Sequence, residues 1–234
     1  MPLASLLMSA CLLAASEPEY DPTTAYTVQQ IEGFTVRVSD RLRRERPAPC
    51  DEALGLLRVK LYDINRAVPA EPLGALRKVT VWVETEDVHG RHVGMCYHPS
   101  REWLTEHGYN PDKAGCIEVA NVANFLSWSG HQPSMVLHEL AHAYHHQVLG
   151  YDHAAIKQAY EHAKEGRLYE SVLRYDGETA RAYALNNDQE YFAELTEAYF
   201  GANDFYPFVR AEVRQYDPVA FAMLEDVWNR TATQ

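Results

Sequence analysis

The spacing of apolar residues changes character about halfway along the chain. In the first half, Lys78 to Glu84 alternates strictly, with valines on one face, a pattern typical of a strand. A segment with helical spacing precedes it at 51–66, with Asp51 as its expected N-cap. The remaining elements expected in this half are strands over 30–38, 92–97 and 116–120, with 92–97 beside 78–84, and a short helix over 99–107.

The second half has mainly helical spacing. Helices are expected over 133–149, 153–165, 188–200 and 217–229, and Gly150 and Gly201 end two of them. Strands that precede helices in this way indicate an α+β fold. We therefore predict one domain over 30–234, in which a small N-terminal mixed sheet with one or two helices (30–125) is followed by a mainly helical lobe (126–234).

The first fifteen residues are apolar and small, and polar residues follow them. An apolar core with an Ala-rich end near Ala15 is typical of an export signal, although no Lys or Arg precedes the core. This pattern predicts a secreted or periplasmic protein in which 16–29 is a lead-in to the domain. Two alternatives stay open, a lipoprotein signal with a lipidated Cys11 and a simple apolar tail. The segment is too short to span a bilayer, so no transmembrane segment is expected.

Composition excludes several classes of protein. The 234 residues are 47% hydrophobic and 23% charged, which is ordinary for a globular chain. The formal net charge of -12, with no basic cluster, argues against nucleic-acid binding, because that binding replaces phosphate counterions with Lys and Arg. Past the apolar segment, the cysteines are Cys50, Cys96 and Cys116. A Cys96–Cys116 disulfide and three free thiols are both compatible with this number.

The candidate chemistry begins with His138-Glu139-Leu140-Ala141-His142, which lies inside a predicted helix. Four residues make about one helical turn, so His138 and His142 project from the same face and can share one cation. Two imidazoles at this spacing suit Zn²⁺, and Glu139 lies beside them. The helix is apolar on most sides, which predicts burial, and buried imidazoles need partners.

A catalytic zinc ion usually has a third protein ligand and one open position. His145 lies on the same face but about 5 Å further along the axis, which favours a supporting or solvated role. A better ligand is Glu190, in a later predicted helix where Glu190, Glu194 and Glu197 share one face. We expect Glu190 to bind the metal and Glu194 to accept a hydrogen bond from Nδ1–H of His138 or His142. Glu197 is expected to be solvated.

The sequence HELAHAYH, followed 48 residues after His142 by EYFAELTEAYF, resembles the gluzincin metallopeptidases. Within them it is most similar to the anthrax lethal factor catalytic domain and the bacterial Pro-Pro endopeptidases. The resemblance covers roughly residues 75–201, and the spacing between the two helices is longer than in the family. It implies a catalytic tyrosine seven residues before the ligand Glu, and Tyr183 occupies that position.

These observations predict a peptidase that binds one zinc ion and acts on a peptide or protein substrate. Glu139 is the expected general base, and Tyr183 is expected to donate a hydrogen bond to the oxyanion. An edge strand, at 92–97 or at 78–84, is the expected docking site for the peptide. Two other functions stay open, a zinc module that only binds a partner and a zinc hydrolase of a non-peptide amide. A di-iron bundle is disfavoured, because it needs a second E-x-x-H on another helix.

Overall fold

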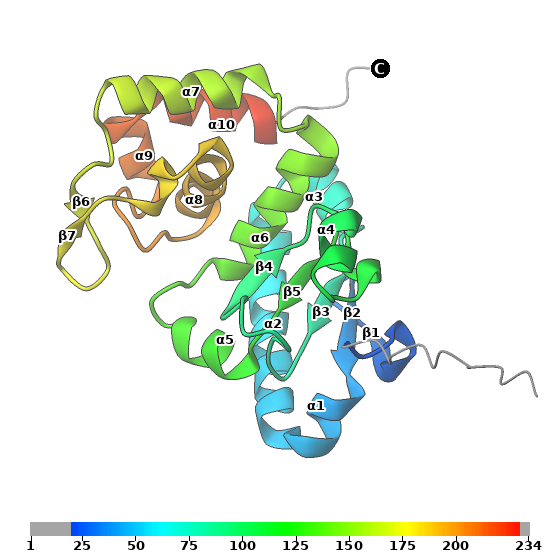
Figure 1. The fold of residues 1–234 in the computed structure, drawn as a ribbon. Coiled ribbons are helices and arrows are strands. Elements are labelled where there is room, and N and C mark those ends of the chain that lie inside the picture. The colour runs from blue at the N-terminus through cyan, green and yellow to red at the C-terminus, as the bar shows by residue number, and fades with distance from the viewer. Residues whose placement is uncertain (1–19, 230–234) are drawn as a thin grey trace, which may run out of the picture.

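The computed structural model describes residues 20–229, so the predicted export signal, Cys11 and residues 16–19 lie outside the described part. The fold is α+β, as predicted: a five-stranded mixed sheet forms in the N-terminal part, and the C-terminal half is mostly helical (Figure 1). Within residues 20–229, no helix combines the length and the apolar character needed to cross a membrane.

The strand order of the sheet is β1-β2-β3-β5-β4. Neighbouring pairs are antiparallel at β1/β2 and β5/β4 and parallel at β2/β3 and β3/β5. The strands are β1 (Tyr26–Ile31), β2 (Phe34–Ser39), β3 (Val81–Val83), β4 (Met95–Tyr97) and β5 (Ile117–Val119). Strand β4 is therefore an edge strand, whereas β3 lies in the interior of the sheet.

Two expectations about the strands are wrong. Residues 30–38 do not form one strand, because Glu32 and Gly33 have φ values of 52° and 86° and turn the chain into a β1–β2 hairpin. Segment 92–97 forms β4 over its last three residues, but β4 pairs with β5 and not with β3. Strand β5 pairs in parallel with β3 and so occupies the side of β3 where β4 was expected to pair.

The N-terminal part has more helices than the one or two expected. They are α1 (Asp40–Glu45), α2 (Pro47–Ala67), α3 (Ala70–Leu76), α4 (Arg101–Glu106) and α5 (Val122–Trp128), with short 3₁₀ turns at Thr23–Ala25 and Pro111–Lys113. Helix α2 begins at a proline four residues before Asp51, so Asp51 lies inside the helix and is not its cap. Helix α5 crosses the expected boundary between the lobes at residue 125, and β1 begins within the expected lead-in.

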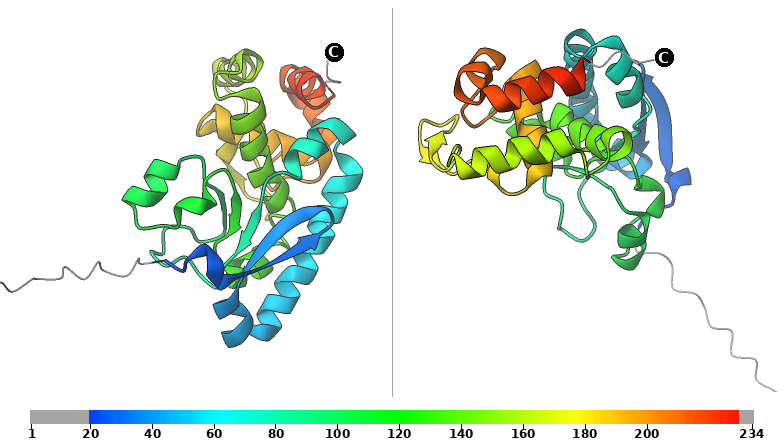
Figure 2. Two further views of the ribbon diagram at one scale, coloured as in Figure 1. Left: turned by 90° about the vertical axis from the view of Figure 1, so that its right-hand side faces the viewer. Right: turned by 90° about the horizontal axis from the view of Figure 1, so that it is seen from above.

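The helical half contains α6 (Met135–Tyr144), a π-helical turn (His145–Leu149), α7 (Ala154–Glu165), a 3₁₀ turn (Tyr183–Leu185), α8 (Asp188–Phe200), α9 (Arg210–Tyr216) and α10 (Pro218–Trp228). A small hairpin forms from β6 (Val172–Leu173) and β7 (Thr179–Ala180), with Asp176 and Gly177 in the turn between them. Helix α6 lies between the sheet and the other C-terminal helices and contacts both β4 and α8 (Figures 1 and 2). The fold therefore places α6 where residues from both halves of the chain can meet.

A buried network of charged residues lies beneath the edge strand. Lys113 Nζ donates to Glu84 Oε1 and to Glu118 Oε1, each at 2.7 Å, and all three residues are buried. His98 Nε2 lies 2.5 Å from Glu118 Oε2. Burial opposes the charge of Lys113, but its two carboxylate neighbours outweigh burial and raise the pKa of Lys113. The network links β5 to the segment that follows β4 and so holds the edge of the sheet in place.

Candidate metal centre

The structure brings His138, His142 and Glu190 together at one point between α6 and α8. Nε2 of His138 and Nε2 of His142 are 3.0 Å apart, and Glu190 Oε2 lies 3.1 Å from the first and 3.3 Å from the second. Zinc ligands at bond lengths of about 2.0–2.1 Å in a tetrahedron are about 3.3 Å apart. The three atoms are thus arranged like one face of a zinc coordination tetrahedron, and the donor set of two imidazoles and one carboxylate fits that ion.

Local sequence explains why each ligand is in place. His138 and His142 are one turn apart on α6, which is buried on most sides as expected from its apolar residues. Glu190 lies in the first turn of α8, where its backbone N–H donates to the side chain of the N-cap Asn187 at 2.8 Å. This cap fixes the start of the helix and therefore the height at which the Glu190 carboxylate meets α6.

The carboxylates and imidazoles at the centre stabilise one another's charged forms. Burial raises the pKa of Glu190, but hydrogen bonds from His138 and His142 outweigh it and hold the pKa at about 2. Burial lowers the pKa of His138, but its bonds with Glu190 and Glu197 outweigh burial and hold that pKa well above its usual value. Without a metal, the two carboxylates therefore favour the protonated form of His138.

The structure corrects the expected partner of His138. Nδ1–H of His138 donates to Glu197 Oε1 at 2.7 Å, whereas Glu194 Oε1 is 3.9 Å away and outside hydrogen-bond range. Glu197 is buried and not solvated, so that expectation is wrong. The sequence spacing could have indicated this contact. Glu197 follows Glu190 by seven residues, about two helical turns, so both lie on one face of the helix and the His138 ring reaches both carboxylates.

The expected supporting or solvated role of His145 is also wrong. It opens the π-helical turn, is fully buried, and neither of its ring nitrogens has a hydrogen-bond partner. Its ring contacts Tyr151 and Phe192 edge-on. Burial lowers the pKa of His145 to about 4. The residue is therefore a neutral core side chain, neither solvated nor hydrogen-bonded to a ligand.

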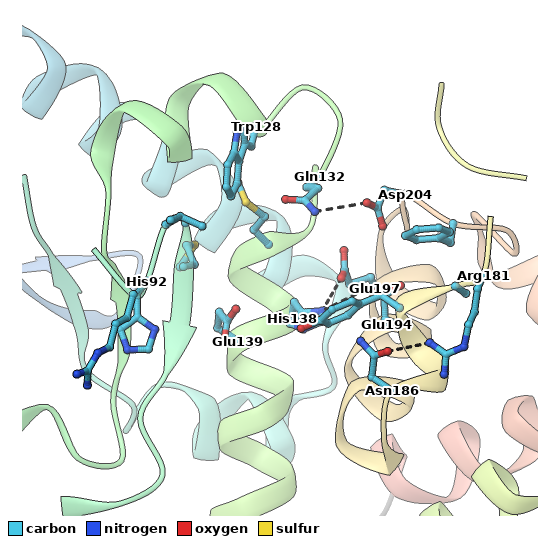
Figure 3. A pocket seen from close by; sticks show the side chains of 18 residues that line it. His92, Trp128, Gln132, His138, Glu139, Arg181, Asn186, Glu194, Glu197 and Asp204 are labelled. Atoms are coloured by element: carbon cyan, nitrogen blue, oxygen red, sulfur yellow. Dashed lines mark hydrogen bonds and ion pairs between the residues drawn. The ribbon is translucent and has the colours of Figure 1, made fainter. Parts of the chain in front are cut away.

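A cleft extends to both sides of the metal centre. One cavity of about 450 Å³ and another of about 320 Å³ share five lining residues, His92, Met95, His138, Glu139 and Tyr183. Glu139 and Tyr183 thus both face the space in front of the candidate ligands, and Figure 3 shows Glu139 beside His138. Tyr183 is 48% exposed, and burial of part of its ring raises the pKa of the phenol, which keeps its proton.

Arg181 and Asn186 support the position of Tyr183. The Arg181 guanidinium donates to Asn186 Oδ1 and to the carbonyl of Leu185, each at 2.8 Å, and so brackets the 3₁₀ turn that contains Tyr183. This turn packs against α8. The phenol is thus held relative to the helix that carries Glu190.

Across the cleft, His92, Cys96 and His98 form a second group of potential ligands, which sequence reasoning missed. His98 Nε2 already lies 2.5 Å from Glu118 Oε2, so this nitrogen belongs to the buried charge network. In the described chain, Cys50, Cys96 and Cys116 are all free thiols, and the Cys96–Cys116 pair considered above does not form.

Comparisons of the chain with models of known protein families, with curated proteins and with solved structures found no match. Only the residues of the site therefore indicate a function.

Proposed function

We propose that this protein is a zinc-dependent metallopeptidase of the gluzincin type. The observation that carries the proposal is the close triangle of His138, His142 and Glu190 ligand atoms in a cleft that Glu139 and Tyr183 also line. When bound, a zinc ion would lower the pKa of a water molecule toward about 7 and polarise the carbonyl of the scissile bond.

The residues of the chain would divide the remaining work among them. Glu139 accepts the proton of the attacking water and returns it to the leaving amine, as a general base and then a general acid. The phenol of Tyr183, which holds its proton, donates a hydrogen bond to the oxyanion that develops on the substrate. Glu197 holds the His138 ring through Nδ1, which leaves Nε2 directed at the ion.

The substrate would bind along β4. This strand pairs only with β5 among the described strands, and Met95, Cys96 and Tyr97 line the cleft. An extended peptide can add to such an edge through main-chain hydrogen bonds. Strand β3, the other strand considered from the sequence, is paired on both sides and offers no free edge. A cleft that continues on both sides of the metal centre suits a polypeptide more than a small amide, and this favours a peptidase over an amide hydrolase.

The proposal is tested with Glu139→Gln and His142→Ala. Glu139→Gln should keep zinc but lower kcat by at least about 100-fold, because the general base is lost. His142→Ala should lose zinc, as measured by metal analysis of the purified protein. Glu178→Gln, an exposed glutamate of the β6–β7 turn, is the matched control and should retain both zinc and hydrolysis. Full activity of Glu139→Gln on a peptide library would refute the mechanism, and a zinc-loaded protein that cleaves no peptide would favour the binding module.

A further inference from the structure

The larger cavity of the cleft is lined by three buried carboxylates that no Lys or Arg among residues 20–229 neutralises. Glu194, Glu197 and Asp204 all line it, and all three are at most 7% exposed. Glu197 accepts from His138, but Oε2 of Glu194 has no hydrogen-bond partner. Asp204 accepts one long hydrogen bond, 3.4 Å from Gln132 Nε2. No Lys or Arg in the described chain forms an ion pair with any of the three carboxylates.

Burial is unfavourable for a carboxylate that no Lys or Arg pairs with. Burial raises the pKa of Asp204. The backbone holds Asp204 in this environment, since Tyr175 N–H donates to its carbonyl at 2.8 Å and Phe205 pairs with Arg174. A positive group that entered the cavity would therefore be bound by carboxylates that are already in place.

Part of the cavity wall is apolar, and polar residues that include Gln132, Arg91 and Arg181 line the rest. Met95, Trp128, Met135 and Phe205 contribute to the apolar part. The Trp128 ring lies so close to the backbone of Gly94 that a Cβ there would be 2.8 Å from it, so this wall is closely packed. Figure 3 shows Gln132 between Trp128 and Asp204, with His138 and Glu139 below them in the view.

A long aliphatic stem with a cationic end fits such a cavity. Lys and Arg bury their methylene stems against apolar surface and keep their charged ends at polar groups. A second hard metal ion would instead take oxygen ligands on most sides and would make no use of Met95, Trp128 or Phe205. The mixture of an acidic end and apolar walls therefore favours a side chain over an ion.

We propose that this cavity binds a Lys or Arg side chain of the substrate next to the scissile bond, with its charge at Asp204 and its stem between Met95 and Trp128. The inference rests on the proposed peptidase function and specifies its substrate class. Asp204 is then a specificity-determining residue, and its role is separate from that of the metal ligands.

The experiment uses the zinc-loaded protein and a matched set of fluorogenic peptides. A library digest first gives a cleaved sequence, in which one residue beside the cleaved bond is varied among Lys, Arg, norleucine and Glu. Norleucine has a stem like that of lysine without the charge, so the ratio of kcat/KM for Lys over norleucine isolates the electrostatic contribution. We expect a ratio of at least about tenfold, equivalent to ~1.4 kcal/mol. In Asp204→Asn this ratio should fall close to one, and the exposed substitution Asp51→Asn should leave it unchanged.

Each outcome decides the question. Cleavage with no preference for Lys or Arg, or a preference that survives in Asp204→Asn, overturns the inference and leaves the peptidase function intact. A second bound divalent ion per chain that is lost in Asp204→Asn shows that the carboxylates hold a metal, and overturns it as well. If no peptide is cleaved although zinc is bound, the proposed function fails and the inference fails with it. If the wild-type series shows no preference, the inference is overturned whether or not a variant folds.

Discussion

The contrast between Glu197 and Glu194 gives a sharp prediction about zinc affinity. Both are buried glutamates on α8, three residues apart, but only Glu197 accepts the hydrogen bond from His138 Nδ1, at 2.7 Å against 3.9 Å for Glu194. Loss of such a partner typically lowers metal affinity 10- to 100-fold, because the imidazole loses its fixed tautomer and orientation. We therefore expect Glu197→Gln to weaken zinc binding by about 10- to 100-fold, or ~1.4–2.7 kcal/mol.

Glu194→Gln is the matched control. Burial and the charge of Glu197 raise the pKa of Glu194 well above its usual value, which favours the neutral form of its side chain, and glutamine resembles that form in shape and charge. Its effect on zinc affinity should be below about threefold, since neither a charge nor a bond to His138 is lost. Competition with a chromophoric chelator at fixed pH measures both affinities, and circular dichroism verifies the fold. An unchanged affinity in Glu197→Gln, or an equal loss in the two variants, would refute the assignment of Glu197.

The remaining predictions concern protonation and burial. Zinc binding at neutral pH should release about one proton, because the pKa of His138 is raised well above its usual value. Calorimetry in buffers of different ionisation enthalpy measures this release. If no proton is released, the assignment of charge to His138 is wrong. The pKa of His145 is about 4 in the folded state and near 6.5 in the unfolded chain. As the pH is lowered, the unfolded chain therefore takes up this proton first, and the free energy of unfolding falls by up to about 3 kcal/mol between pH 6.5 and pH 4. Urea unfolding should show that His145→Leu loses this part of the pH dependence, and an unaltered profile would argue against a buried neutral imidazole. Lys113→Met should cost about 3–5 kcal/mol in urea unfolding, because it leaves buried carboxylates unpaired, whereas the exposed control Lys157→Met should cost under about 1 kcal/mol; equal effects would refute this role of the network.

Local patterns explain which parts of the fold were predictable. Helix α8 begins and ends at the residues expected from its periodicity, with Asn187 as the cap and Gly201 after it, because these signals act within one or two turns. The positions of His138 and His142 on one face of α6 also follow from local geometry alone. Strand partners were less predictable: β3 pairs with β5, although β4 precedes β5 in the chain, because a parallel pair is joined by a crossover whose course is decided by packing.

The sequence by itself determined the α+β class, the two helices that carry the candidate ligands and the chemistry of their side chains, since each depends on residues a few positions apart. Only the tertiary structure decided that Glu197 and not Glu194 holds His138, that His145 is buried without partners, and that Asp204 lies at the end of the cavity beside the metal centre. The physical reason is distance along the chain. Asp204 and His138 are 66 residues apart, and their juxtaposition depends on how α6, α8 and the following loop pack together, which no local pattern encodes.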